Sequence, residues 1–190
     1  MSAARDAGAP APSADLSEQL VAHVPALRAF ARSLARDASA ADDLVQETVL
    51  KAWTNLDKYQ PGTNMRAWLF TIQRNTFYSL ARKRRWEVED VDGAHAARVP
   101  QRAQQDGALD LRDFRTAFAT LPEDQREALT LVGAAGFTYD EAAAICGCAT
   151  GTVKSRVNRA RARLTEILGL DEAYAADAAL DAAVAAQPGL

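Results

Sequence analysis

The chain has few of the residues that build metal sites and catalytic centres. Its 190 residues include two cysteines and two histidines. Cys146 and Cys148 lie far along the chain from His23 and His95, whereas a zinc site requires about four ligands brought together. We therefore expect reduced, half-buried cysteines, and we predict no metal site and no cofactor.

Long apolar runs are also missing. No run approaches the roughly 20 apolar residues of a membrane-spanning helix, and residues 1–20 lack the apolar core of a signal peptide. The composition, 48% hydrophobic and 25% charged, is typical of a globular protein. We expect a cytoplasmic protein that does not contact membranes.

Positive charge is concentrated in two stretches, although the net charge of the chain is −3. Residues 66–85 contain six cations and no acid, and residues 149–164 contain five cations and no acid. Together they hold 11 of the 22 lysines and arginines, while residues 86–111 hold six acids and two cations. A solvated helix face usually mixes both signs, so this pattern favours two surfaces that bind a polyanion such as nucleic acid.

The spacing of the apolar residues predicts an all-α protein. No long stretch alternates apolar and polar residues, and glycine or proline rarely interrupts the helical spacing. A polar, acidic segment in the middle is typical of a flexible linker, so we predict two small helical domains joined by it. The predicted organisation is a disordered tail (1–15), a first domain (16–86), the linker (87–108), a second domain (109–170) and an Ala-rich acidic tail (171–190).

The second domain has the pattern of a helix-turn-helix. Thr138 and Glu141 have the spacing of a capping box that starts a short helix. Gly147 suits the tight turn that follows, and a longer helix comes after it. Ala143 and Val153 fall where two steeply crossing helices need a small residue and a buried aliphatic residue.

That longer helix separates an apolar face from a basic face. Its predicted buried stripe consists of Val153, Val157, Ala160, Leu164, Ile167 and Leu168. Small side chains on the opposite side would approach base edges in a major groove, and long cations on either flank would reach phosphates. The predicted DNA-facing residues are Thr152, Lys154, Ser155, Arg156, Asn158, Arg159, Arg161, Ala162 and Arg163.

The helix predicted at residues 42–53 of the first domain has a mixed outer face. Its predicted buried face consists of Leu44, Val45, Thr48, Val49, Ala52 and Trp53. Its predicted outer face consists of Asp43, Gln46, Glu47 and Leu50. A single exposed leucine usually has no function, but an apolar anchor with a polar rim is also typical of a protein-binding surface. The residues alone leave both interpretations open.

A longer helix is predicted at residues 65–85. Its inward face consists of Trp68, Leu69, Ile72, Thr76 and Leu80, and another arc consists of Thr71, Arg74, Asn75, Tyr78 and Arg82. This second arc combines cations, an amide and an aromatic ring. Single-stranded nucleic acid is bound by that mixture, because cations contact the backbone and aromatic rings stack on bases. One domain therefore suits opened DNA and the other suits duplex DNA.

The chain resembles bacterial RNA polymerase sigma factors of the extracytoplasmic-function (ECF) type over about residues 16–168. The resemblance rests on DDLVQETVLKAW (42–53), RAWLFTIQRNTFYSLARKRR (66–85) and LPEDQREALTLVGAAGFTYDEAAAICGCATGTVKSRVNRARARL (121–164). Within these, YQPGTNMRAWLFTIQRNTFY and ICGCATGTVKSRVNRARARL look most like the subgroup that drives the general stress response.

The resemblance implies a protein that binds core RNA polymerase, recognises the minus-thirty-five and minus-ten promoter elements, and melts DNA to initiate transcription. It implies core RNA polymerase, promoter DNA and a small helical anti-sigma factor as partners of a chain that is monomeric when free. The implied polymerase contacts are Asp43, Gln46, Glu47 and Leu50. The implied minus-ten residues are Trp68, Arg74, Asn75, Tyr78, Arg82 and Lys83, with Asn75 at a flipped base. The implied minus-thirty-five residues are Lys154, Ser155, Asn158 and Arg159, with Arg156, Arg161 and Arg163 on phosphates.

Two other classes of protein fit parts of the sequence. A nucleic-acid enzyme would need an acid–base or metal cluster, but Asp43 and Glu47 have no histidine or further ligand beside them, so we predict no enzymatic activity and no catalytic residue. A stand-alone helix-turn-helix regulator would explain residues 109–168 but would leave Trp68, Asn75 and Tyr78 without a role.

Overall fold

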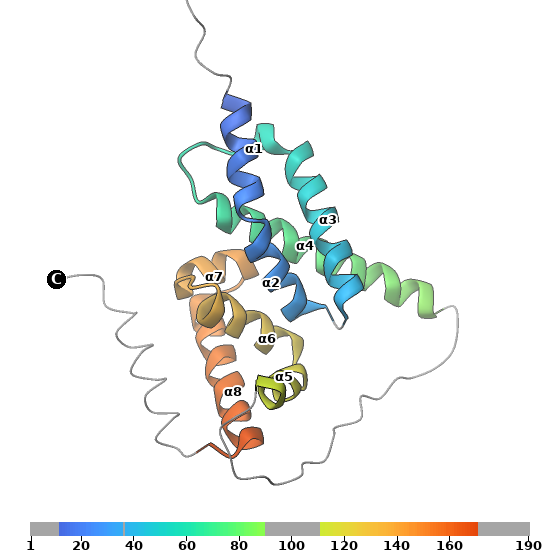
Figure 1. Cartoon of the computed structure of the whole chain (residues 1–190). Helices are drawn as coiled ribbons and strands as arrows, with labels where there is room; N and C mark the ends of the chain where they lie inside the picture. The colour runs from blue at the N-terminus through green and yellow to red at the C-terminus, as the bar shows by residue number, and fades with distance from the viewer. Residues whose placement is uncertain (1–11, 36, 90–110, 171–190) are drawn as a thin grey trace, which may run out of the picture.

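The computed structural model describes residues 12–35, 37–89 and 111–170, and within these ranges the only regular structure is helical. The all-α prediction is therefore confirmed for this part of the chain. The predicted tail at 171–190 and most of the predicted linker lie outside the described residues. The α-helices, drawn in Figure 1, are α1 (Pro12–Ala22), α2 (Val24–Leu34), α3 (Ala38–Thr54), α4 (Met65–Glu89), α5 (Leu111–Ala119), α6 (Glu123–Leu129), α7 (Tyr139–Cys146) and α8 (Thr150–Leu168).

Two predicted boundaries differ from the structure. Helix α1 begins at Pro12, inside the predicted tail 1–15. Proline is favoured in the first turn of a helix, because its missing N–H would have no intrahelical partner there. Helix α4 continues to Glu89, into the predicted linker 87–108. The linker was predicted from its acidic composition, but glutamate is a good helix former and does not end a helix.

Helices α1 to α4 form a first unit built around an aromatic centre. Phe30 of α2 and Phe70 of α4 stack with ring centroids 4.8 Å apart, and both are buried. Leu27, Leu44 and Leu69 complete the centre of this bundle, with at most 2% of their surface exposed. The amide of the buried Gln73 donates to the carbonyl of Leu27 at 2.9 Å, which ties α4 to α2.

Helices α5 to α8 form a second unit, in which α8 packs across α5, α6 and α7 (Figure 1). Between α6 and α7 the chain makes a π-helical turn, Thr130–Ala134, and then a bend at Gly136 with φ +68°. A smaller hydrophobic cluster lies between α5 and the end of α8. It consists of Ala117, Leu121, Ala160, Leu164 and Leu168.

The two units share one hydrophobic core. Phe137 of the second unit lies edge-on to Phe70 of the first, with centroids 5.0 Å apart. The contiguous buried cluster extends from Leu27 and Phe30 through Phe70 to Ile145 and Val153. Polar contacts add to this packing, because the Arg126 guanidinium of α6 donates to the carbonyls of Ser33 (3.2 Å) and Leu34 (3.4 Å) at the end of α2. The structure is therefore closed, with the two units in direct contact.

The predicted capping box is present at the start of α7. The Thr138 hydroxyl oxygen accepts from the Glu141 N–H at 3.2 Å, and the Glu141 carboxylate accepts from the Thr138 N–H at 2.9 Å. The same carboxylate accepts from the Asn64 amide at 3.0 Å, just before α4. These hydrogen bonds, led by the one from the Thr138 backbone, lower the pKa of Glu141 from its ordinary value of 4.5.

Replacing Glu141 with glutamine keeps the shape of the capping box but removes a carboxylate from the helix N-terminus, so it is expected to lower the free energy of unfolding by about 0.3–1 kcal/mol at pH 7. A depressed carboxylate pKa means that this stabilisation is present above the ordinary pKa and is lost as the pH falls through the folded pKa. The difference between wild type and Glu141→Gln should therefore shrink below about pH 4.5. Urea titrations followed by circular dichroism at several pH values test this, with Thr138→Ser as a control that keeps the capping hydroxyl. A difference that stays constant with pH would contradict it.

Candidate nucleic-acid and protein interfaces

The helix-turn-helix of the second unit has the predicted geometry. Gly147 ends α7 in the left-handed conformation with φ +63° and ψ +38°, which is accessible to glycine at little cost. Ala143 is 5% exposed and Val153 is fully buried, so both lie at the crossing of α7 and α8. The hydroxyl of Thr150 donates to the Asp140 carboxylate at 2.7 Å and joins the first turns of the two helices. The turn therefore presents α8 as a fixed, protruding element.

The faces of α8 agree with the helical spacing. Val153, Val157, Ala160, Leu164 and Leu168 are buried, and Ile167 is half-buried. The opposite side carries the small exposed residues Ser155, Asn158 and Ala162. The predicted DNA-facing cations Lys154, Arg159 and Arg163 are exposed, and Arg161 is half-buried. This surface is basic, with small side chains along its centre.

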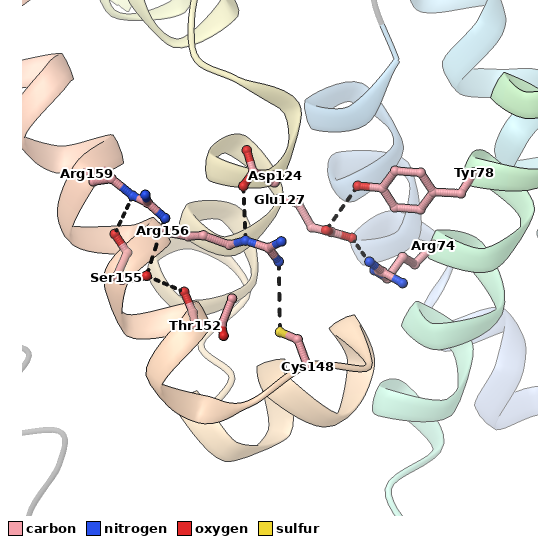
Figure 2. Close-up of polar contacts among 9 residues, drawn as sticks. All are labelled: Arg74, Tyr78, Asp124, Glu127, Cys148, Thr152, Ser155, Arg156 and Arg159. Carbon is pink, nitrogen blue, oxygen red and sulfur yellow. Dashed lines mark hydrogen bonds and ion pairs between the residues drawn. The ribbon is translucent and has the colours of Figure 1, made fainter. Parts of the chain in front are cut away.

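Arg156 differs from the other cations of α8. Its Nε lies 3.0 Å from the Asp124 carboxylate of α6, and its Nη1 lies 3.9 Å from the Cys148 sulfur (Figure 2). Only 22% of its side chain is exposed. Arg156 therefore fastens α8 to α6 within the second unit, so a phosphate contact by this residue would require it to leave Asp124.

The predicted minus-ten arc of α4 is partly open and partly covered. Asn75, Arg82 and Lys83 are exposed, as a surface that reads unpaired bases requires. Trp68 is half-buried and packs against Tyr59, with centroids 5.3 Å apart. The Tyr59 hydroxyl in turn donates to the carbonyl of Thr63 at 2.5 Å. Through these two contacts Tyr59 holds the loop that precedes α4 next to the Trp68 indole.

The covered part of this arc contacts Glu127 of α6. The Arg74 Nε lies 2.6 Å from Glu127 Oε1, and the Tyr78 hydroxyl donates to Glu127 Oε2 at 3.2 Å. Figure 2 shows both side chains reaching from α4 to this one carboxylate. The Arg74 guanidinium also lies 4.7 Å from the centroid of the Tyr78 ring. Glu127 is fully buried and Arg74 and Tyr78 are half-buried, so the three groups form a largely buried polar network between the units.

Burial perturbs the protonation of this network. Burial raises the pKa of the Glu127 carboxyl group, although the positive charge of Arg74 acts to lower it. Burial alone would lower the pKa of Arg74, but the adjacent Glu127 carboxylate outweighs this and raises it. Burial and the same carboxylate raise the pKa of Tyr78, which therefore stays a hydroxyl donor at neutral pH. Glu127 was not among the residues predicted from the sequence, because a glutamate in a short helix is normally solvated.

The outer face of α3 is apolar at its centre. Leu50 is 60% exposed, and Asp43 and Gln46 are exposed beside it. Glu47 is half-buried and pairs with Lys51 at 3.1 Å. Trp53 was predicted to be buried, and this prediction is wrong, because 54% of its surface is exposed. Trp53 lies two helical turns after Gln46 and therefore on the same side of α3. We call the group Asp43, Gln46, Leu50 and Trp53 the α3 patch.

Among the described residues, no group of three or more histidine, cysteine, aspartate or glutamate side chains could hold a metal ion. Of the helices described, none has the length and apolar content needed to cross a membrane. Cys146 and Cys148 are free thiols, and burial raises the pKa of Cys146 to about 12.

A helix-turn-helix with a basic second helix, packed against a helical bundle with an aromatic and basic face, defines a transcription factor that contacts DNA through two units. Comparison with known families agrees with this class. Residues 20–87 match the family model of Sigma-70 region 2, and residues 111–164 match that of Sigma-70 region 4. The chain belongs to the ECF-type RNA polymerase sigma factors, which recognise promoters and initiate transcription.

Individual relatives extend the match over most of the chain. The ECF RNA polymerase sigma factor EcfG of Rhodopseudomonas palustris is 58% identical over 158 residues, which cover 83% of this chain and 87% of the relative. The sigma factor RpoE from Bartonella quintana, solved in complex with the anti-sigma factor NepR, is 54% identical with a TM-score of 0.73, over 83% of this chain and 98% of that one. CnrH, solved with the cytosolic domain of CnrY, is 30% identical with a TM-score of 0.57, over 84% of this chain and 96% of CnrH.

Proposed function

We propose that the two units divide promoter recognition between them, with α4 reading the opened minus-ten element and α8 reading the minus-thirty-five duplex. The observation that carries this proposal is the charge and shape of the exposed surfaces. Helix α8 presents Ser155 and Asn158 between exposed cations, and α4 presents Asn75 beside Arg82. The first arrangement fits a major groove, and the second fits single-stranded DNA.

The α3 patch is the proposed contact with core RNA polymerase. Its exposed leucine and tryptophan form an apolar centre, and Asp43 and Gln46 form a polar rim. Exposed aromatic and aliphatic anchors with such rims are typical of protein-binding surfaces. The proposed site therefore lies on α3, apart from the basic surface of α8. Acting with RNA polymerase, the protein would work in the cytoplasm and would have no catalytic residues of its own.

Two finer proposals come from the relatives. The similarity to EcfG and the motif details in residues 59–78 and 145–164 favour the general stress subgroup. RpoE was solved in complex with the anti-sigma factor NepR, and CnrH was solved in complex with the cytosolic domain of CnrY. By similarity we propose that a small anti-sigma factor also regulates this chain.

A stand-alone helix-turn-helix regulator was the second candidate from the sequence, and one observation argues against it. The exposed Asn75 and Arg82 of α4 and the α3 patch would have no role in a protein that used only α8. One module with about five phosphate contacts also binds duplex DNA weakly at physiological salt. We therefore expect weak binding to duplex DNA without polymerase, and tight binding would favour this second candidate.

The test is run-off transcription with sigma-free core RNA polymerase on a pooled promoter library. Wild type should give transcripts that start at a fixed distance from a two-part motif. Asn75→Ala and Lys154→Ala should each reduce transcription about tenfold, since one lost base or phosphate contact is worth about 1–3 kcal/mol. Val21→Ala, an exposed change on α1 and outside both proposed DNA surfaces and the α3 patch, is the control. No transcript and no retention on core polymerase would contradict the proposal.

A further inference from the structure

The buried carboxylate of Glu127 lies on the face of α4 that is proposed to bind DNA. Arg74 and Tyr78 both contact it, at 2.6 Å and 3.2 Å. Only 20% of the Arg74 side chain is exposed, whereas the next residue, Asn75, is exposed. The closed structure thus leaves one part of the proposed minus-ten surface open and covers the other part with the second unit.

The contact with Glu127 exists only while the two units are packed together. Glu127 belongs to α6, whereas Arg74 and Tyr78 belong to α4. The neighbouring Arg126 holds the same helix to the end of α2 through the Ser33 and Leu34 carbonyls. Movement of α6 away from α4 would therefore break both contacts and release Arg74 and Tyr78 to solvent.

A carboxylate and a DNA phosphate compete for the same partner. The guanidinium group of arginine forms charge-assisted hydrogen bonds with either anion through the same N–H donors. The Tyr78 hydroxyl likewise donates to one acceptor at a time, and its ring is covered on one side by Arg74. In the closed form Glu127 uses the Arg74 Nε and the Tyr78 hydroxyl, and only 20% of the Arg74 side chain is exposed, so a single strand would have to displace Glu127 to use these donors.

The chemistry of this contact also makes it reversible. When an ion pair is buried, the loss of hydration offsets much of the attraction between the charges, so such a pair adds little net stability compared with apolar packing. In the separated state both charges would regain water. The Arg74–Glu127 pair therefore adds little to the apolar contact of Phe70 with Phe137 that also joins the units, and movement of α6 and its unit away from α4 has to separate both contacts.

We propose that Glu127 is an intramolecular competitor of single-stranded promoter DNA. It occupies Arg74 and Tyr78 in the closed form, and these residues reach DNA only after α6 has moved away from α4. This inference rests on the proposed minus-ten role of Arg74 and Tyr78. The closed protein is thus autoinhibited by its own second unit.

The test measures binding of the full chain, without polymerase, to a fluorescein-labelled single-stranded DNA of random sequence, about ten nucleotides long. Glu127→Gln removes the charge and keeps the shape of the side chain. Affinity rises in proportion to the fraction of molecules in the binding-competent form, and we expect Glu127→Gln to lower the dissociation constant about tenfold. Fluorescence anisotropy gives this constant, and circular dichroism checks that each variant is folded.

Three further variants separate release of Arg74 from other causes. Asp113→Asn, at an exposed acid of α5, changes the net charge equally and should leave the affinity nearly unchanged. Arg126→Ala should also tighten binding although it removes a positive charge, and it provides a second route to the open form should Glu127→Gln not fold. In an Arg74→Ala background, Glu127→Gln should give a much smaller gain, because only Tyr78 is left to be released.

Failure of this inference is distinguishable from failure of the proposed function. If Glu127→Gln binds no more tightly than Asp113→Asn while Arg74→Ala still weakens transcription by the holoenzyme, Glu127 is not a competitor and the promoter role stands. An equal gain with and without Arg74 would also overturn the inference. Normal transcription by Arg74→Ala would overturn both the inference and the proposed role of Arg74.

Discussion

Replacing Phe70 with alanine is expected to lower the free energy of unfolding by about 3–5 kcal/mol, the range for a fully buried phenylalanine. Phe70 is 1% exposed, stacks on Phe30 at 4.8 Å and meets Phe137 edge-on at 5.0 Å. Removal of its ring would leave a cavity that lies at the junction of the two units. Both the bundle of the first unit and the packing of the second unit against it would lose contacts.

Urea unfolding followed by circular dichroism measures this loss. Val21→Ala is the matched control, since Val21 is 60% exposed and a surface change of this kind shifts stability by less than about 0.5 kcal/mol. Phe70→Leu should fall between the two, because it keeps much of the apolar volume. Equal unfolding midpoints for Phe70→Ala and Val21→Ala would show that the shared core does not stabilise the protein.

Short-range features of this protein could be predicted from the sequence. The capping box of Thr138 and Glu141, the left-handed Gly147 and the buried stripe of α8 all depend on residues within a few turns of one another. Their geometry follows from helical spacing and from the conformations that each residue type prefers. These signals were sufficient to predict an all-α fold with a helix-turn-helix and to place Lys154, Arg159 and Arg163 on the outer side of α8, but not the pairing of Arg156 with Asp124.

The closed packing of the units depends on long-range contacts and could not be predicted. Arg74 and Glu127 are 53 residues apart in the chain, with the predicted linker between them. Arg126 and Ser33 are 93 residues apart. No local pattern identifies a glutamate that will lose all contact with solvent, because the same residue on an isolated amphipathic helix would be solvated. The role of Glu127 therefore became visible only in the structure.

The error at Trp53 has a different origin. The indole is large and apolar, and that chemistry favoured a buried position. Helical spacing puts it three residues after Leu50 and seven after Gln46, which is the outer side of α3. Ala52, the neighbouring residue, is fully buried, so the core side of the helix end is already occupied. Spacing was the better guide than hydrophobicity at this position.

The exposure of Trp53 strengthens the prediction that α3 binds polymerase. Leu50 and Trp53 are 60% and 54% exposed and lie one turn apart on α3. Leu50 was the only apolar residue predicted on this surface, and the exposed indole adds a much larger one. Tryptophan is among the residues that contribute most when a protein interface forms, so Trp53 is expected to contribute more than Leu50.

Trp53→Ala is expected to weaken binding to core RNA polymerase by about 2 kcal/mol, or roughly 30-fold, as for other tryptophan hot spots. Trp53→Phe should retain most of the affinity because an aromatic anchor remains. Titration of labelled protein with core polymerase measures both constants, with Val21→Ala as a control for loss of an exposed apolar group outside α3. The free energy of unfolding should change little, since the indole is largely solvated in the free protein. If Trp53→Ala binds core polymerase as tightly as Val21→Ala does, the α3 patch is not the polymerase contact, and the exposed indole must serve another partner.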